Sequence, residues 1–399
     1  MTADRARRAP PAASPTAAGQ AGQEATASPA GPEATAGPPG HGAVASMAGQ
    51  GAVVGRIRPG RAIAVASAVL VLAVIAGVAV GPAGLSLPTV AQALLSRLPW
   101  HPAVPVSAVD VAVVWQVRLP RVVLGALVGA MLAGSGAAYQ GVFRNPLADP
   151  YLLGVAAGGG LGATMIIVTG ANSALLPPAA FAGAVGAVAL TYFLGASASR
   201  DGAAPGVAAS ASIVLAGVAV AALLTALQTY LQQQHTPDLQ AVYSWILGGL
   251  AVATWSDIGL VLPYLVVAAG VLLAHRRLLD VLRVGEVEAA SLGVDVARLR
   301  ITVVAAATLG AASAVAVSGL IGFVGIIVPH TVRLTAGASY RIVLPVSMIG
   351  GAAFLILADI AARTVQSPAE VPIGVITAVV GAPFFLFVLR SRRASRDLA

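Results

Sequence analysis

The chain has 399 residues, of which 58% are hydrophobic and 10% are charged, and its formal net charge is +8. A soluble domain carries roughly 25% charged residues, so the composition predicts a polytopic membrane protein and excludes an ordinary soluble domain. The 23 basic residues are all arginine. A P-loop needs a lysine that reaches the β- and γ-phosphates. This chain is therefore no P-loop ATPase, and ATP that drives it must be hydrolysed by another polypeptide.

The sequence contains no cysteine, which excludes disulfides and thiolate-bound metals. Its five histidines are scattered, with no pair at the spacing of metal ligands. Neither a Gly-x-Ser-x-Gly nor a His-Glu-x-x-His motif occurs. We therefore expect no metal site, no catalytic residues and no bound nucleic acid.

The first 55 residues are rich in Ala, Pro, Gly, Ser and Thr and contain almost no large apolar side chain. A segment of this composition cannot bury a core, so we expect a disordered tail. It does not resemble a signal peptide, because no apolar stretch follows its early arginines.

Apolar stretches long enough to span a bilayer recur after residue 55. Ten are predicted, at 62–81, 119–139, 152–170, 176–197, 207–230, 257–274, 301–318, 322–336, 342–361 and 371–389. The predicted fold is therefore all-α with ten transmembrane helices. Its membrane domain covers 56–391, and residues 392–399 form a short tail.

Arginine placement predicts the orientation of these spans. If the N-terminus is cytoplasmic, the outer segments hold only four arginines: Arg97, Arg118, Arg121 and Arg363. All the other arginines beyond residue 55 then lie on the inner side. This asymmetry predicts a multi-pass protein of the cell membrane with both termini in the cytoplasm.

Glycine spacing predicts close helix packing in the third span. Gly154, Gly158 and Gly162 repeat every four residues, which lets helix backbones approach each other. The run 158–162 could be read as a phosphate-binding loop. However, no strand precedes it and no acidic partner for a ribose follows, so helix packing is the better interpretation.

The stretch 318–333 is apolar but interrupted by Gly319, Gly322, Gly325 and Pro329. Broken apolar segments buried among other helices are typical of transporters. His330, next to the proline, is expected to be a packed side chain rather than a proton relay.

Residues 275–300 mix charged and apolar side chains between two spans. The mixture predicts two short amphipathic helices, separated by breaks at Gly285 and Gly293, on the membrane surface or docked on a partner. A solvated loop that satisfies the charge rule is the alternative, and the residues alone leave both open.

Three blocks in order resemble the FecCD-type permeases of ABC importers for iron–siderophores, haem and vitamin B12. The first runs from Arg118-Leu119-Pro120-Arg121 to Asn145-Pro146-Leu147-Ala148-Asp149-Pro150 and Leu153-Gly154-Val155. The second runs from Leu279-Asp280 to Leu292-Gly293-Val294. The third runs from Gly319 through Pro329-His330 to Gly381-Ala382-Pro383-Phe384-Phe385.

The resemblance covers about residues 60–391 and implies a vitamin B12 importer permease-like fold. It also implies a homodimer on a dimer of ABC ATPase subunits, fed by an extracellular substrate-binding lipoprotein. ATP and magnesium would be bound by the ATPase, and this chain would bind no cofactor. The short segment 232–249 resembles the family's extracellular helix after the fifth span.

The resemblance also implies roles for individual residues. ATPase coupling would fall to Asp280, Gly285, Glu286, Ala289, Leu292 and Gly293. The binding protein would dock on Arg118, Arg121 and Arg363, although interfacial snorkelling or an Asp359–Arg363 pair within one helix is the alternative. The fifth and tenth spans would line the pathway, with Thr225, Gln228, Thr229 and Thr377 as its few polar groups.

The predicted function is the permease subunit of an ATP-driven importer, with iron–siderophore complexes as the expected substrate. Haem and cobalamin are alternatives, because no residue chooses among these substrates. An ion-coupled secondary transporter is a further alternative, but it needs ionisable relay residues within the spans. Most of the predicted spans have none.

Overall fold

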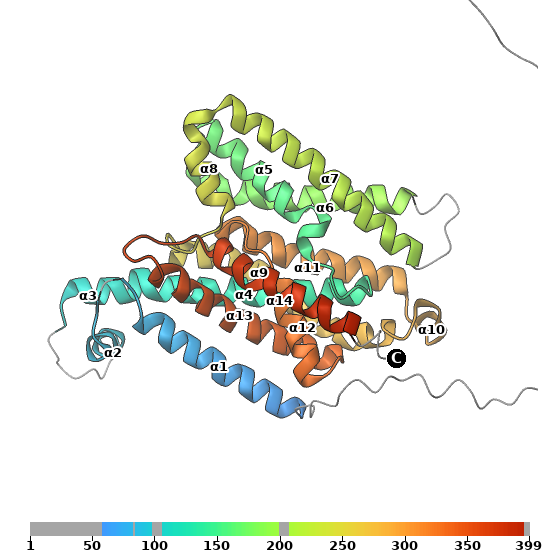
Figure 1. Ribbon diagram of the computed structural model, residues 1–399, viewed down its shortest axis with the longest axis horizontal. Helices are drawn as coiled ribbons and strands as arrows, with labels where there is room; N and C mark the ends of the chain where they lie inside the picture. The colour runs from blue at the N-terminus through green and yellow to red at the C-terminus, as the bar shows by residue number, and fades with distance from the viewer. Residues whose placement is uncertain (1–57, 83, 98–105, 199–206, 395–399) are drawn as a thin grey trace, which may run out of the picture. The chain divides into compact units, whose positions relative to one another are not determined.

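The computed structural model describes residues 58–82, 84–97, 106–198 and 207–394, all within one unit of the chain. The predicted tail of residues 1–55 lies outside this part, as do residues 395–399. No strand occurs among the described residues, which form helices and short connections (Figure 1). This confirms the predicted all-α fold class.

The helices before residue 199 are α1 (Pro59–Ala79), α2 (Leu87–Leu95), α3 (Ala108–Ala112), a π-helical turn (Val113–Arg118), α4 (Leu119–Val142), α5 (Val155–Val168) and α6 (Leu176–Ala198). Those after residue 206 are α7 (Val207–Gln234), α8 (Leu239–Ile246), α9 (Trp255–Leu282), α10 (Glu286–Ser291), α11 (Val296–Ser318), α12 (Val324–Ala336), α13 (Tyr340–Thr364) and α14 (Ile373–Ala394). Short 3₁₀ helices cover Pro150–Leu153, Ser173–Leu175 and Thr236–Asp238.

Among the described residues, seven helices are long and apolar enough to cross a membrane, and three shorter apolar helices accompany them. The shorter ones are α5, α12 and the apolar part of α14. Each of the ten predicted spans corresponds to one of these ten helices. The prediction of ten spans is thus confirmed, and the short stretch 322–336 becomes the 13-residue helix α12.

Helix α4 is the central element, with 78% of its apolar window buried, whereas α1 lies at the edge with 22% buried (Figure 1). Helices α5, α6 and α7 pack on one another and reach the other helices mainly through α11.

Glycine permits the closest approaches between helices. A Cβ at Gly158 would overlap the carbonyl oxygen of Gly183, and one at Gly129 would overlap that of Gly351. The helix-packing interpretation of 158–162 is confirmed.

The break predicted in 318–333 is confined to five residues. Helix α11 ends at Ser318, Gly319 and Phe323 have positive φ, and α12 then includes Gly325 and Pro329. Irregular backbone needs internal partners in a membrane. The Tyr151 hydroxyl lies 2.8 Å from the amide nitrogen of Ile321 and donates to the carbonyl oxygen of the same residue over 3.0 Å. His330 is buried and meets the Phe384 ring edge-on, which confirms a packed histidine.

Candidate functional site

Five charged side chains converge where α4 begins and α13 ends, and we call this the arginine end of the bundle. Arg118 closes the π-helical turn, Arg121 lies in the first turn of α4, and Asp359 and Arg363 lie near the end of α13. Glu370 lies in the connection to α14. The loop end, where α10 lies, is at the other end of the same helices.

Arg121 joins two carboxylates from distant parts of the chain. Its Nε donates to Asp359 Oδ1 over 2.9 Å, and its Nη2 donates to the same oxygen over 2.8 Å. Its Nη1 and Nη2 also donate to Glu370 Oε1 and Oε2, over 2.7 and 3.0 Å. The planar guanidinium can form such paired bonds with two carboxylates at once, which a lysine could not do. The network ties α4, α13 and the start of α14 together.

Arg118 and Arg363 satisfy the last carbonyl groups of α1. Arg118 Nη1 donates to the carbonyl oxygens of Val78 and Ala79, over 2.9 and 2.8 Å. Arg363 Nη2 donates to the carbonyl oxygen of Gly77 over 2.8 Å. Cations are favourable at a helix C-terminus, where these carbonyls have no partner within the helix. The two arginines therefore hold α1 against the central helices.

The predicted docking arginines are consequently buried in this conformation. The exposed fractions of Arg118, Arg121 and Arg363 are 3%, 6% and 2%. The alternative pair within α13 is present, with Arg363 Nε 3.4 Å from Asp359 Oδ2. Docking stays a prediction, and it requires the network to open toward the binding protein.

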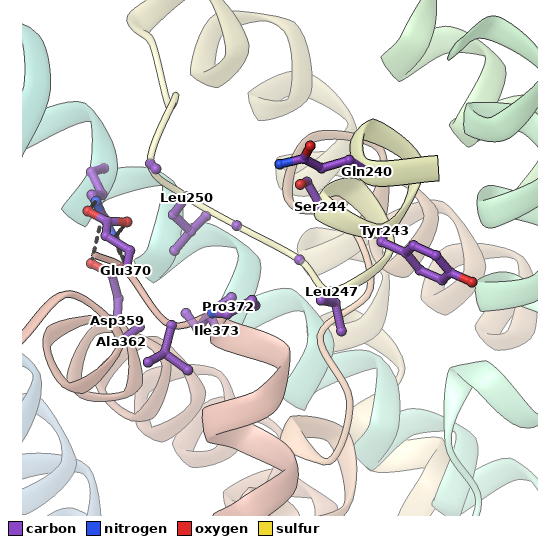
Figure 2. A pocket seen from close by; sticks show the side chains of 15 residues that line it. Gln240, Tyr243, Ser244, Leu247, Leu250, Asp359, Ala362, Glu370, Pro372 and Ile373 are labelled. Atoms are coloured by element: carbon purple, nitrogen blue, oxygen red, sulfur yellow. Dashed lines mark hydrogen bonds and ion pairs between the residues drawn. The ribbon is translucent and has the colours of Figure 1, made fainter. Parts of the chain in front are cut away.

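A cavity of about 620 Å³ lies beside this network. Figure 2 shows Gln240 and Ser244 of α8 on one side of it and Asp359 and Glu370 on the other. The amide of Gly374 donates to the Leu247 carbonyl over 3.0 Å and so joins α14 to the end of α8. Sequence reasoning does not find Glu370 as part of this charged wall, because its partner Arg121 is 249 positions away.

The four predicted pathway residues do not share one surface. Thr225 and Thr229 are exposed on α7. Gln228 is buried, and its Nε2 donates to Thr164 Oγ1 of α5 over 3.1 Å. Thr377 is fully buried and donates to the carbonyl oxygen of Gly374. In this conformation only the two threonines of α7 can face a pathway.

The predicted coupling segment contains one short helix, so the expectation of two is wrong. Helix α9 continues to Leu282 and α11 begins at Val296, which leaves only α10 between the breaks at Gly285 and Gly293. Gly293 has φ +83°, a conformation that glycine adopts without strain. Helices α9 and α11 extend beyond their apolar stretches, so the residues that flank those stretches belong to these long helices and not to a second short helix.

The other predicted coupling residues are of two kinds: some bond to or pack on neighbouring helices, and others are exposed. Asp280 accepts from the Ser339 hydroxyl and from the amide of Tyr340, both over 2.6 Å, at the start of α13. Glu286 pairs with Arg300 of α11 over 2.5 Å, and Ala289 is fully buried. Leu292 is 72% exposed. Two further apolar side chains of this segment are as exposed: Val284 and Val287.

Residues 145–150 form the connection after α4 at the loop end. The Asn145 side chain accepts from the amide of Leu147, and the Asp149 side chain accepts from the amide of Tyr151. Burial raises the pKa of Asp149 to about 6, although its bond to the Tyr151 amide partly opposes this rise. Nearby, Arg333 donates to the Gln140 side chain, which donates to the carbonyl oxygen of Gly325 and so links α4 to α12.

In the described part of the chain, an all-helical bundle with ten apolar helices, an irregular break between two of them and charge concentrated at its two ends is typical of a membrane permease. Residues 69–391 match the model of the FecCD transport family. The chain belongs to this family of ABC transporter permeases.

Similar proteins come from distant organisms. The chain is 40% identical to a cobalamin import system permease of Halobacterium salinarum, with 82% of this chain and 95% of that one covered. It is 37% identical to a hemin transport system permease of Yersinia pestis, with 86% and 99% covered. A solved inward-facing structure of a metal-chelate type ABC transporter matches with a TM-score of 0.70 and 30% identity, covering 83% and 99%.

Proposed function

We propose that this chain imports a metal chelate as the permease subunit of an ATP-driven transporter in the cell membrane. The observation that carries the proposal is the family match over residues 69–391, together with the ten-helix bundle. The similar permeases act on cobalamin, hemin and, in Bacillus subtilis, Fe(3+)-citrate. These substrates share a metal held by an organic ligand. Iron–siderophore is our candidate among them, with haem and cobalamin as alternatives.

We further propose a homodimeric pathway between the α7 and α14 helices of two copies. Both helices carry large apolar side chains that nothing in the described part of the chain covers. On α7 these include Leu215, Val218 and Leu223, and on α14 Val379 and Phe387. Because the walls are apolar, they would hold no polar chelate tightly, which suits a conduit fed by a separate binding protein.

The loop end is the proposed contact for the ATPase. Val284, Val287 and Leu292 supply an exposed apolar surface in a charged segment, as a docking helix requires. Asp280 in the last turn of α9 bonds to the start of α13, and Glu286 of α10 pairs with Arg300 of α11, so that a displacement of the whole segment would reach both α13 and α11. ATP would drive transport by stabilising one of two conformations of the dimer.

The arginine end is the proposed seat of the binding protein, outside the cell, with both termini of the permease in the cytoplasm. Carboxylates of the binding protein would compete with Asp359 and Glu370 for the arginines. Binding-protein affinity measured on folded Arg118→Gln permease tests this idea, with the exposed Arg97→Gln as the control. Equal affinity in both variants would remove the docking proposal.

Reconstitution tests the function itself. Liposomes that contain the permease, its ATPase and its binding protein should accumulate a radiolabelled iron–siderophore, haem or cobalamin only with ATP. A preference among the three identifies the substrate. Accumulation that an ion gradient drives without the ATPase would instead support the secondary transporter.

A further inference from the structure

A shallow groove of about 320 Å³ lies at the edge of the bundle between α1, α12 and α13. Its walls include Val65 of α1, Val328 and Val332 of α12, and Val346 and Phe354 of α13. Figure 1 shows α1 lying along this edge. The groove is therefore on a face that the surrounding bilayer can reach in the isolated chain.

The groove offers almost no polar partner to a ligand. Its two hydroxyl groups, of Thr331 and Thr335, donate to the carbonyl oxygens of Ile327 and Thr331 within their own helix. A polar solute would lose its water bonds here without replacement. The groove is therefore suited to a hydrocarbon chain.

Two arginines continue the groove beyond its apolar part. Ala62, Val65 and Ala66 line it from α1. Side chains four residues apart share a helix face, so Arg61 lies one turn before Val65 on that face, and Arg58 directly precedes the first residue of α1, Pro59. Both arginines are exposed, and no ion pair to either occurs among the described residues. The mouth of an apolar groove is therefore positively charged.

We propose that this groove binds one anionic glycerophospholipid, with an acyl chain between α1, α12 and α13 and the phosphate at Arg58 and Arg61. Basic pockets between membrane helices recognise such headgroups. The nine residues of α13 from Val346 to Phe354 span about 12 Å, at a rise of 1.5 Å for each of eight steps. This approaches one leaflet of a hydrocarbon core that is about 30 Å thick. The groove thus matches a chain in a single leaflet.

A second copy of the protein is a poorer occupant. A two-fold contact uses the same patch on both copies. In a membrane it would bring two sets of Arg58 and Arg61 to the same end of the interface, with no carboxylate from this patch to pair with them. Like charges across an interface oppose association. A phosphodiester headgroup supplies the missing negative charge.

Native mass spectrometry of the full-length protein tests the proposal, with added phosphatidylglycerol or phosphatidylcholine. Arg58→Gln with Arg61→Gln should weaken phosphatidylglycerol binding by about fivefold per arginine and leave phosphatidylcholine unchanged. Arg277→Gln with Arg298→Gln is the matched control, because it removes two exposed arginines from the same end but away from the groove. This control should retain wild-type binding within about twofold.

Two variants test the acyl chain. Thr331→Phe and Val65→Trp fill the groove from opposite walls at exposed positions, so at least one should fold. Each should reduce the binding of both lipids. Wild-type binding in a folded groove-filling variant would overturn the proposal, as would equal losses in the matched control. Displacement by soluble glycerol phosphate, or a dimer that these variants dissociate, would overturn it too.

Discussion

The arginine end and the loop end use charge in opposite ways. At the arginine end, three buried guanidinium groups, the buried Asp359 and the more exposed Glu370 join α1, α4, α13 and the start of α14. At the loop end, most charges of the segment between α9 and α11 are exposed, and Asp280 and Glu286 are the two acidic side chains that bond it to neighbouring helices. The difference indicates that the arginine end is held by its own ion pairs, whereas the loop end keeps surface for a partner.

Because of this contrast, substitutions at the two ends should affect different properties of the protein. A buried ion pair is weak evidence for net stability, but breaking one by removing a single partner leaves an uncompensated charge. An exposed apolar side chain contributes little to folding and much to an interface. Substitutions at the arginine end should therefore change stability, and those on α10 should change association.

The largest effect is expected at Arg121. Arg121→Met removes the hydrogen bonds to Asp359 and Glu370 and leaves the buried Asp359 only its longer contact with Arg363, so it should cost about 3–5 kcal/mol of stability. Thermal unfolding in detergent measures this loss, with the exposed Arg97→Met as the control. A loss below about 1 kcal/mol, as expected for exposed pairs, would show that the network is dispensable for folding.

Asp149 differs from most charged residues of the loop end because its carboxylate is buried. Its folded pKa of about 6 lies above the usual value of 3.8, so the folded state favours the protonated form. Its contribution to stability is then highest below pH 4 and is lost as the pH rises to 6, by about 3 kcal/mol at 1.36 kcal/mol per unit. Asp149→Asn should remove this dependence.

Unfolding at fixed denaturant between pH 3.5 and 7.5 measures that slope. Glu288→Gln, an exposed carboxylate of α10, is the matched control and should keep the wild-type profile. If Asp149→Asn kept the wild-type profile, the carboxylate would be hydrated rather than buried.

Hydropathy predicted the ten spans because the thickness of a bilayer fixes the length of an apolar stretch. It could not predict where helices end outside the membrane, which is why the loop between α9 and α11 was expected to hold two helices. Spacing within one helix also predicted the Asp359–Arg363 pair. The bonds of Arg121 to Asp359 and Glu370 could not be predicted, because they join positions 238 and 249 residues apart.

The pathway residues illustrate a further limit. Helix α7 is apolar on all sides, so its sequence does not indicate which face meets a neighbouring helix. Gln228 was assigned to the pathway with Thr225 and Thr229, yet only Gln228 turns toward Thr164 of α5. Packing between helices decides such faces, and that information is not local.

A smaller effect is expected on the surface of α10. Val287→Asp or Leu292→Asp should weaken the permease–ATPase complex by about 2 kcal/mol each, or about 30-fold in affinity, because each places a charge in an apolar contact. Folding stability should change by less than about 0.5 kcal/mol. Co-purification and titration with the ATPase measure the loss.

Val365→Asp is the matched control for Val287→Asp, since both valines are exposed and Val365 lies at the arginine end. It should leave the complex intact. Equal affinity for all three variants would show that α10 is no part of the ATPase contact.

The smallest effect is expected for the ion pair that joins α10 to α11. Glu286 and Arg300 have side chains 19% and 11% exposed, so their ion pair is partly screened from water. A double-mutant cycle with Glu286→Gln and Arg300→Gln should give a coupling energy of about 1 kcal/mol in unfolding. If the pair transmits displacement from α10 to α11, both single variants should retain the ATPase and lose ATP-driven uptake. Normal uptake in a variant with measurable coupling would assign the pair to folding alone, and transmission would then pass through Asp280 and α13.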